Sequence, residues 1–96
     1  MTTLATLQMK VQPGAYGDLE HFLKDNLQRT RGFAGALNIN IYYDAETSNF
    51  MLLEEWLARD HHQAYIDYIS KHGIMEQLLQ FMQGPPTVTY YERAVL

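Results

Sequence analysis

Apolar and polar residues alternate, or recur at helical spacing, in segments that predict most of the secondary structure. Alternation with a period of two predicts four strands, over residues 3–11, 34–43, 50–57 and 87–92. Apolar residues at steps of three and four predict an amphipathic helix over residues 16–31 and a second helix over residues 60–72. We expect Asp60 to cap the second helix, and Gly73 to separate it from a further helical piece over residues 74–82.

The order of these elements predicts one domain, over residues 1–96, with an α+β, ferredoxin-like fold. The order is β-α-β-β-α-β, without a linker or a short repeat. The polar connection over residues 44–49 is short, which makes the second and third strands an antiparallel hairpin. Two right-handed crossovers then give an antiparallel four-stranded sheet with the helices on one face.

The third strand begins with apolar residues on both of its faces. Phe50 and Leu52 point to one side, and Met51 and Leu53 to the other. A strand that is apolar on both faces needs cover on both faces. The chain's own helices cover one face only. We therefore expect a homodimer in which two sheets pack face to face, which is the arrangement of a dimeric α+β barrel.

Composition excludes several classes of function. The net charge is −4 and the seven Lys and Arg residues are scattered, so no basic stripe is present to bind nucleic acid. The chain has no Cys, which excludes disulfides, thiolate metal sites and a Cys nucleophile. The sequence shows neither a signal peptide nor an apolar run of roughly 18 residues, the length of a membrane span. We expect a cytoplasmic protein with no membrane partner.

Histidines near the start of the second predicted helix suggest a metal site, but their spacing argues against one. His61 and His62 are adjacent, so their side chains point about 100° apart on a helix and do not readily share an ion. No carboxylate completes the site. We interpret both as solvated residues at a helix N-terminus, interpret His21 as exposed, and predict no metal site.

The same helix carries an aromatic and imidazole stripe. Tyr65 and His72 are seven residues apart and point almost the same way, with Tyr68 between them. Facing the sheet, they would bring a phenol and an imidazole into an apolar pocket, where His suits the role of general base. The alternative is that all three side chains simply pack the core, which is the commoner use of such a stripe.

Three polar or aromatic residues on the strands are further candidates for the pocket. Glu54 and Trp56 share one strand face, where a carboxylate beside a buried indole is either an acid–base group or a structural hydrogen-bond acceptor. We favour the structural role. Asn40 lies on the polar face of the second strand, which is either a pocket floor or a solvent-facing edge.

Short motifs along nearly the whole chain resemble one family. They are Gly35-Ala36-Leu37 at the second strand, the turn at Asp44, Glu54-Glu55-Trp56, the helix over residues 60–72, and the terminal Tyr91-Glu92. In this order and spacing they resemble the antibiotic-biosynthesis-monooxygenase family of dimeric α+β barrels. Better-known members oxidise phenolic, anthrone-like or quinol substrates with O2 and use neither metal nor flavin.

The resemblance extends to some candidate residues and fails at others. Glu54 and Trp56 match the strand motif, and His72 matches a His common late in the helix. Tyr65 stands where many relatives have His. Haem-degrading members have an Asn on the first strand and a Trp on the second helix, and this chain has neither.

The resemblance and the residues together predict a cofactor-independent monooxygenase for a small aromatic phenol, quinol or anthrone-like substrate. His72 and Tyr65 are the predicted catalytic residues, and the substrate-binding residues are Trp56, Tyr68, Asn40 and Glu54. O2 is the second substrate, with no cofactor. The alternatives are a non-catalytic protein that binds a small ligand or is associated with stress and, less favoured, an isomerase or haem-degrading relative.

Overall fold

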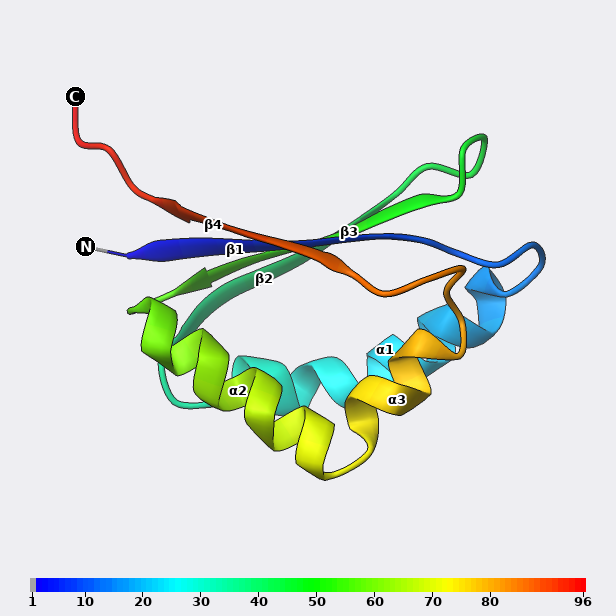
Figure 1. Ribbon diagram of the computed structural model, residues 1–96, viewed down its shortest axis with the longest axis horizontal. Coiled ribbons are helices and arrows are strands. Elements are labelled where there is room, and N and C mark those ends of the chain that lie inside the picture. Colours follow the sequence, from blue (N-terminus) through cyan, green and yellow to red (C-terminus); the bar gives the residue numbers. More distant parts are fainter. Residues whose placement is uncertain (1) are drawn as a thin grey trace.

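The computed structural model describes residues 2–96 and confirms the predicted order of elements (Figure 1). Along the chain these are β1 (Thr3–Lys10), α1 (Tyr16–Arg31), β2 (Ala36–Tyr43), β3 (Asn49–Trp56), α2 (Arg59–Lys71), α3 (Ile74–Leu79) and β4 (Thr87–Glu92).

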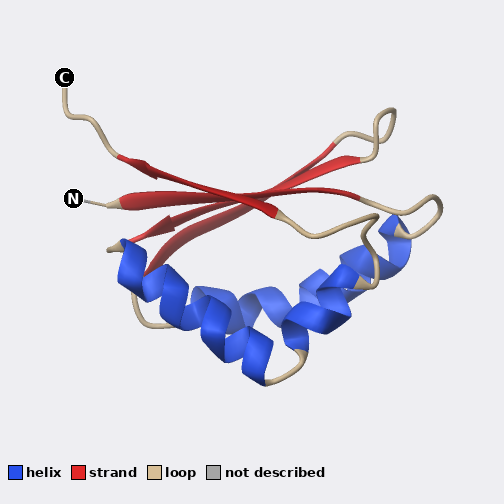
Figure 2. Ribbon diagram, viewed as in Figure 1, coloured by secondary structure: helices blue, strands red, loops and turns tan. Residues whose placement is uncertain are grey.

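The four strands form one antiparallel sheet in the order β2-β3-β1-β4, as the ferredoxin-like topology requires. All three helices lie on one face of this sheet, and the other face is bare (Figure 2). The register places Glu54 between Ala5 of β1 and Ile39 of β2. Because side chains alternate along a strand, Glu54 points with these two toward the helices.

The apolar core lies between the sheet and the helices. Leu19, Leu23 and Leu27 form the buried stripe of α1, at the spacing that the sequence indicates. The side chain of Trp56, at the end of β3, has no exposure at all. The amphipathic helix predicted over residues 16–31 is thereby confirmed as α1, with its apolar stripe buried.

Two local details differ from the sequence predictions. The helix α2 starts at Arg59 with Ala58 as its N-cap, no side chain caps it, and Asp60 lies in its first turn instead. There the negative charge of the Asp60 carboxylate lies near the positive end of the helix dipole, which stabilises the helix. Strict alternation over residues 34–43 would put Leu37 on the same face as Ile39, but Leu37 sits in a β-bulge, where the extra residue breaks the alternation, and is 48% exposed.

The bare face of the sheet keeps the apolar residues that led us to expect a dimer. Met51 and Leu53 are half-buried there, and Tyr42 and Tyr91 are exposed. The dimer itself stays a prediction. Over residues 2–96, no helix has the length and apolar character needed to cross a membrane.

Candidate active site

A narrow cavity of about 30 Å³ lies between the sheet and the helices. Its apolar lining comes from two strands and three helices: Leu7, Phe22, Leu23, Leu27, Leu52, Ile66, Ile69, Ile74, Met75 and Leu78. Four polar side chains complete the wall: Asn26, Thr30, Glu54 and Tyr65. The volume holds about two water molecules, at roughly 10–15 Å³ each. This cavity thus combines an apolar lining with two side chains that carry ionisable groups, Glu54 and Tyr65.

A wider hollow of about 410 Å³ lies beside the end of the β2–β3 hairpin, but it is a weaker candidate. It is an open surface depression, and its one carboxylate, Asp44, is already used by the hairpin turn. Asp44 accepts hydrogen bonds from the Glu46 backbone N–H (3.0 Å) and from the Thr47 hydroxyl (3.0 Å). No acid–base pair remains free in that hollow among the residues that line it.

The Tyr65 phenol forms one side of the polar wall. Tyr65 projects from α2 across the cavity and its hydroxyl hydrogen-bonds to that of Thr30, near the end of α1. Burial raises the pKa of Tyr65 above its ordinary value, and the nearby Glu54 carboxylate raises it further, while the Thr30 hydrogen bond lowers it. The phenol is therefore protonated at neutral pH and is a hydrogen-bond donor.

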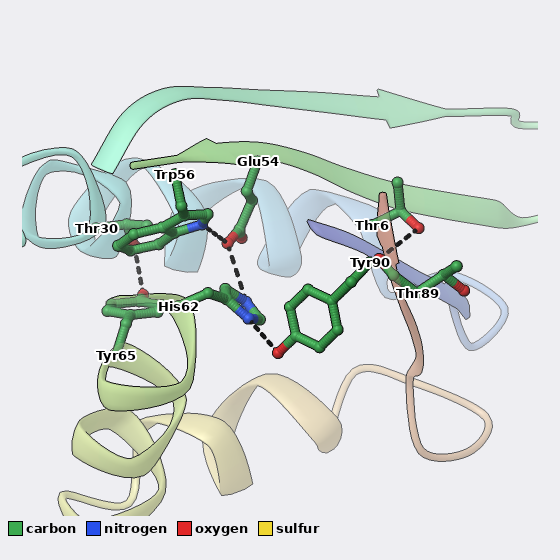
Figure 3. A network of polar contacts seen from close by, with 8 residues as sticks. All are labelled: Thr6, Thr30, Glu54, Trp56, His62, Tyr65, Thr89 and Tyr90. Carbon is green, nitrogen blue, oxygen red and sulfur yellow. Dashed lines mark hydrogen bonds and ion pairs between the residues drawn. The ribbon is translucent and has the colours of Figure 1, made fainter. Parts of the chain in front are cut away.

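Glu54 is the carboxylate of the site and is 2% exposed. Its Oε1 accepts a hydrogen bond from the Trp56 indole N–H at 3.1 Å. The same oxygen lies 3.4 Å from Nε2 of His62. Both contacts fall on Oε1 and neither involves Oε2, as the dashed lines in Figure 3 show for the Trp56 and His62 side chains.

The structure corrects the prediction for His62. This residue was expected to be solvated, but its side chain is completely buried. It lies three residues before Tyr65 and seven before Ile69, so all three occupy the inward face of α2. Its Nδ1 pairs with the Tyr90 hydroxyl at 2.7 Å. The helical spacing alone was sufficient to find this residue.

Tyr90 connects the buried network to the surface at the β4 edge. Its ring is half-buried, and the Arg59 guanidinium carbon lies 4.2 Å from the ring centre in a cation–π contact. Burial raises the pKa of Tyr90, although Arg59 lowers it. A continuous chain of contacts therefore runs from Trp56 through Glu54 and His62 to Tyr90 (Figure 3).

Of the predicted site residues, Glu54, Trp56 and Tyr65 come together. The rings of Trp56 and Tyr65 are 5.4 Å apart, and both Glu54 and Tyr65 line the cavity. Their roles in catalysis and substrate binding stay predictions.

The other three predicted site residues lie away from the cavity. Tyr68 is 37% exposed and its ring contacts that of His72, with ring centres 4.4 Å apart and the planes tilted by 46°. His72 is exposed because α2 ends at Lys71, so His72 leaves the helix geometry that the seven-residue spacing assumes. Asn40 pairs with Leu53 across the sheet and so points to the bare face, with the sheet between it and the cavity.

Within residues 2–96, no three His, Asp or Glu side chains gather closely enough to hold a metal ion. What the site offers is proton chemistry. A carboxylate and an imidazole that lie 3.4 Å apart are able to take up a proton, and the Tyr65 phenol has an O–H group that is able to donate a hydrogen bond. Apolar side chains surround both and strengthen such electrostatic interactions.

No family model matches the chain, and no curated protein sequence matches it. Solved structures do match. A conserved protein from Methanosarcina mazei Go1 is 16% identical with a TM-score of 0.85, over 98% of this chain and 94% of that one. A structure named antibiotic biosynthesis monooxygenase is 16% identical with a TM-score of 0.81, over 99% of this chain and 100% of that one.

A monooxygenase from the gene ActVA-Orf6 of Streptomyces coelicolor, in complex with the ligand nanaomycin D, is also similar. It is 16% identical with a TM-score of 0.76, over 98% of this chain and 90% of that one. Likeness at this level of identity establishes the fold. The predicted resemblance to antibiotic biosynthesis monooxygenases is thus confirmed in the fold, across nearly the whole chain.

Proposed function

We propose that this chain is a cofactor-independent monooxygenase that oxidises a small phenol, quinol or anthrone-like substrate with O2. The observation that carries the proposal is the buried carboxylate–imidazole pair, Glu54 and His62, next to a phenol donor at the wall of an apolar cavity. The fold shared with proteins named as monooxygenases supports it, as does the ligand nanaomycin D bound to one of them.

Glu54 is the proposed base. Its carboxylate, which lines the cavity, removes a proton from the substrate hydroxyl or from an acidic C–H group, and Tyr65 donates a hydrogen bond to the substrate oxygen on which negative charge develops. The electron-rich anion then reduces O2. For a phenol or anthrone, the substrate loses two hydrogen atoms and gains one oxygen atom, and the second oxygen atom leaves as water.

This proposal moves the base from His72, which the sequence favoured, to Glu54. His72 is exposed and contacts Tyr68, and neither residue lines the cavity, so His72 has no access to a substrate bound there. A substrate ring needs more room than about 30 Å³, so binding requires the helices to separate. The part of the wall that α3 supplies, through Ile74, Met75 and Leu78, is joined to α2 by two residues outside the helices, and we expect this part to move aside.

Oxygen uptake with a panel of simple phenols, quinols and anthrones tests the function. We expect the wild type to consume O2 with at least one class, and Glu54→Gln to lower the rate by about 10²- to 10⁴-fold, the usual contribution of a general base. His72→Ala is the matched control and retains wild-type activity. Absence of uptake above background across the whole panel would contradict the proposal.

The competing function is storage or transport of a small apolar ligand without chemistry. It is favoured by the predominantly apolar lining of the cavity. Calorimetric titration with the same compounds under nitrogen separates the two. Binding without any O2 consumption in air supports the carrier, and binding followed by consumption supports the enzyme.

A further inference from the structure

A series of aromatic rings leads from the cavity to the surface of the molecule. Tyr65 lies at the cavity wall, and its ring centre is 5.4 Å from that of Trp56. The series continues from Trp56 to the His62 ring at 5.5 Å, and from there to the Tyr90 ring at 5.3 Å (Figure 3). Tyr90 is half-buried at the edge of the sheet. Because electrons tunnel rapidly between rings at such separations, an electron is able to move from the surface to the cavity.

Oxidation of a Trp or Tyr ring in an apolar interior requires an acceptor for its proton. Loss of one electron makes either ring a strong acid, and a charged ring without a partner is costly to bury. Trp56 has an acceptor, because its indole N–H donates to Oε1 of Glu54 at 3.1 Å. Tyr90 has another, because its hydroxyl lies 2.7 Å from Nδ1 of His62. Both rings are therefore placed for electron loss together with proton loss.

The Glu54 carboxylate favours the tautomer of His62 that this transfer needs. Nε2 of His62 lies 3.4 Å from Oε1 of Glu54. A carboxylate attracts an N–H group and repels a lone pair, so in the neutral ring it favours the proton on Nε2 and leaves the lone pair on Nδ1. The Tyr90 hydroxyl is then the donor of the 2.7 Å contact. When its proton moves to Nδ1, the imidazolium lies beside a carboxylate, so the new buried charge is paired.

Tyr90, rather than Tyr65, is the ring that we expect to stay oxidised. The Tyr65 hydroxyl pairs with the Thr30 hydroxyl, which is a very weak base and a poor acceptor for a proton. Burial raises the pKa of Tyr90, so its phenol keeps its proton until the ring is oxidised. The Arg59 guanidinium carbon lies 4.2 Å from the Tyr90 ring centre and disfavours a positive charge on that ring. Both effects favour a neutral tyrosyl radical, with the proton on His62.

We propose that Tyr90 is a redox-active residue that removes oxidising radicals from the cavity through Trp56, with His62 as its proton acceptor. This inference rests on the proposed function. The reaction of a substrate anion with O2 passes through a peroxide, and homolysis of its O–O bond leaves oxygen-centred radicals beside the apolar side chains of the cavity. An electron supplied along the series of rings converts such a radical into an oxyanion before it attacks the protein.

Electrons and protons balance in this sequence. The oxygen-centred radical takes one electron from Trp56 and becomes an oxyanion. Trp56 takes one electron from Tyr90, and the Tyr90 O–H bond breaks as its proton passes to Nδ1 of His62. A one-electron reductant of the ascorbate class in solution then reduces the tyrosyl radical at the half-buried edge, and His62 returns the proton. The proton that the reductant loses converts the oxyanion into an alcohol.

Photoionisation of Trp56 by a laser flash tests the route without O2 or substrate. Trp56 is the one Trp of the chain, so light at the red edge of indole absorption forms the radical there alone. We expect the Trp radical to convert into a tyrosyl radical, and to do so more slowly in deuterated water. Tyr90→Phe keeps the ring that contacts Arg59 and should lose the tyrosyl absorption. Tyr68→Phe, at an exposed ring, is the matched control and should keep it.

Two further variants identify the proton acceptor and the oxidised ring. His62→Gln, with its folding checked by circular dichroism, should slow the conversion by about 10²-fold, the lower end of what a positioned proton acceptor contributes. Tyr65→Phe should still form the tyrosyl radical. A tyrosyl signal that survives in Tyr90→Phe would overturn the inference, as would a Trp56 radical that forms no tyrosyl radical in the wild type. An unchanged rate in folded His62→Gln would overturn the role of His62.

Turnover distinguishes a failure of this inference from a failure of the proposed function. With a panel compound that supports O2 uptake, in the presence of ascorbate, Tyr90→Phe should accumulate oxidised Trp56 and oxidised Met75 of the cavity wall, both found by mass spectrometry. The wild type should stay intact. If O2 uptake is normal but the flash forms no Tyr90 radical, only this inference fails. If no compound is oxidised, the proposed function fails, and the removal of radicals fails with it even where the flash forms the Tyr90 radical.

Discussion

At the scale of single residues, the molecule depends on one buried polar group that the rest of the core holds in place. The His62 ring lies 5.5 Å from the ring of Trp56 and 5.3 Å from that of Tyr90, and has no exposure to solvent. Removing it would leave a cavity and would also leave Glu54 without its neighbour. Both effects are destabilising.

We therefore expect His62→Ala to lower the free energy of unfolding by about 2–4 kcal/mol. His21→Ala, which removes the same side chain from an exposed position on α1, should change it by no more than about 0.5 kcal/mol. Urea denaturation followed by the fluorescence of Trp56, the one Trp of the chain, measures both. Equal stability of the two variants would contradict the burial of His62.

Tyr65 gives a second residue-scale prediction, on pH. Its folded-state pKa is raised above the ordinary 10.0, mainly by burial, so the folded state holds the phenol proton more tightly than the unfolded state does. This contribution to stability is complete below pH 10.0 and is lost as pH rises through the folded-state pKa. Melting temperatures should therefore fall as pH rises above 10.0, and they should fall less steeply for Tyr65→Phe. The pKa values of Tyr16 and Tyr90 are also raised, so these two residues contribute to the fall that remains in Tyr65→Phe.

At the scale of elements, the spacing of apolar residues along the chain predicted which faces of the helices and strands are buried. The buried stripe of α1 and the alternation of β1 and β3 follow from one repeat each, and both are observed. His62 fits the same inward stripe of α2, but its polarity and its place near a helix start suggested solvent. The contact that makes its burial tolerable, with Tyr90, joins residues 28 apart and is invisible to local pattern.

The remaining misses come from element ends and irregularities. His72 was expected to continue the Tyr65 face, but α2 stops one residue earlier, and helix ends are not fixed by sequence to that precision. Leu37 lies at a β-bulge, and no residue in the bulge allowed it to be predicted from the sequence. Asn40 was left open between pocket and surface, because alternation assigns residues to a shared face without saying which face the helices cover.

The break between α2 and α3 carries a prediction of its own. Gly73 has φ +76°, in the left-handed region, and no atom lies within 4 Å of the position where a Cβ would stand. Gly73→Ala should therefore destabilise through backbone strain alone, by about 1–2 kcal/mol. Gly17→Ala is the matched control, because Gly17 lies within α1 with equally open space. It should leave stability unchanged or raise it by up to about 1 kcal/mol.

At the scale of the whole molecule, one face of the sheet has no cover from the chain itself. Helices cover the side that holds Glu54 and Trp56, while the opposite side presents half-buried Met51 and Leu53 to the surroundings. A sheet face that carries apolar side chains and has no cover within its own chain is expected to pack against a second layer. The bare face of a second copy matches it, and pairing two equal faces gives a closed, symmetric dimer.

We therefore expect the protein in solution to have twice the mass of the chain, measured by light scattering coupled to size-exclusion chromatography. Leu53→Lys places a charge at the centre of the bare face and should give monomers. Val88→Lys is the control: Val88 is also on the sheet and partly exposed, but it lies opposite Leu7 and so faces the helix side. Its dimer should persist. A monomeric wild type, or dissociation by Val88→Lys alone, would mean that the bare face of the sheet is not the interface.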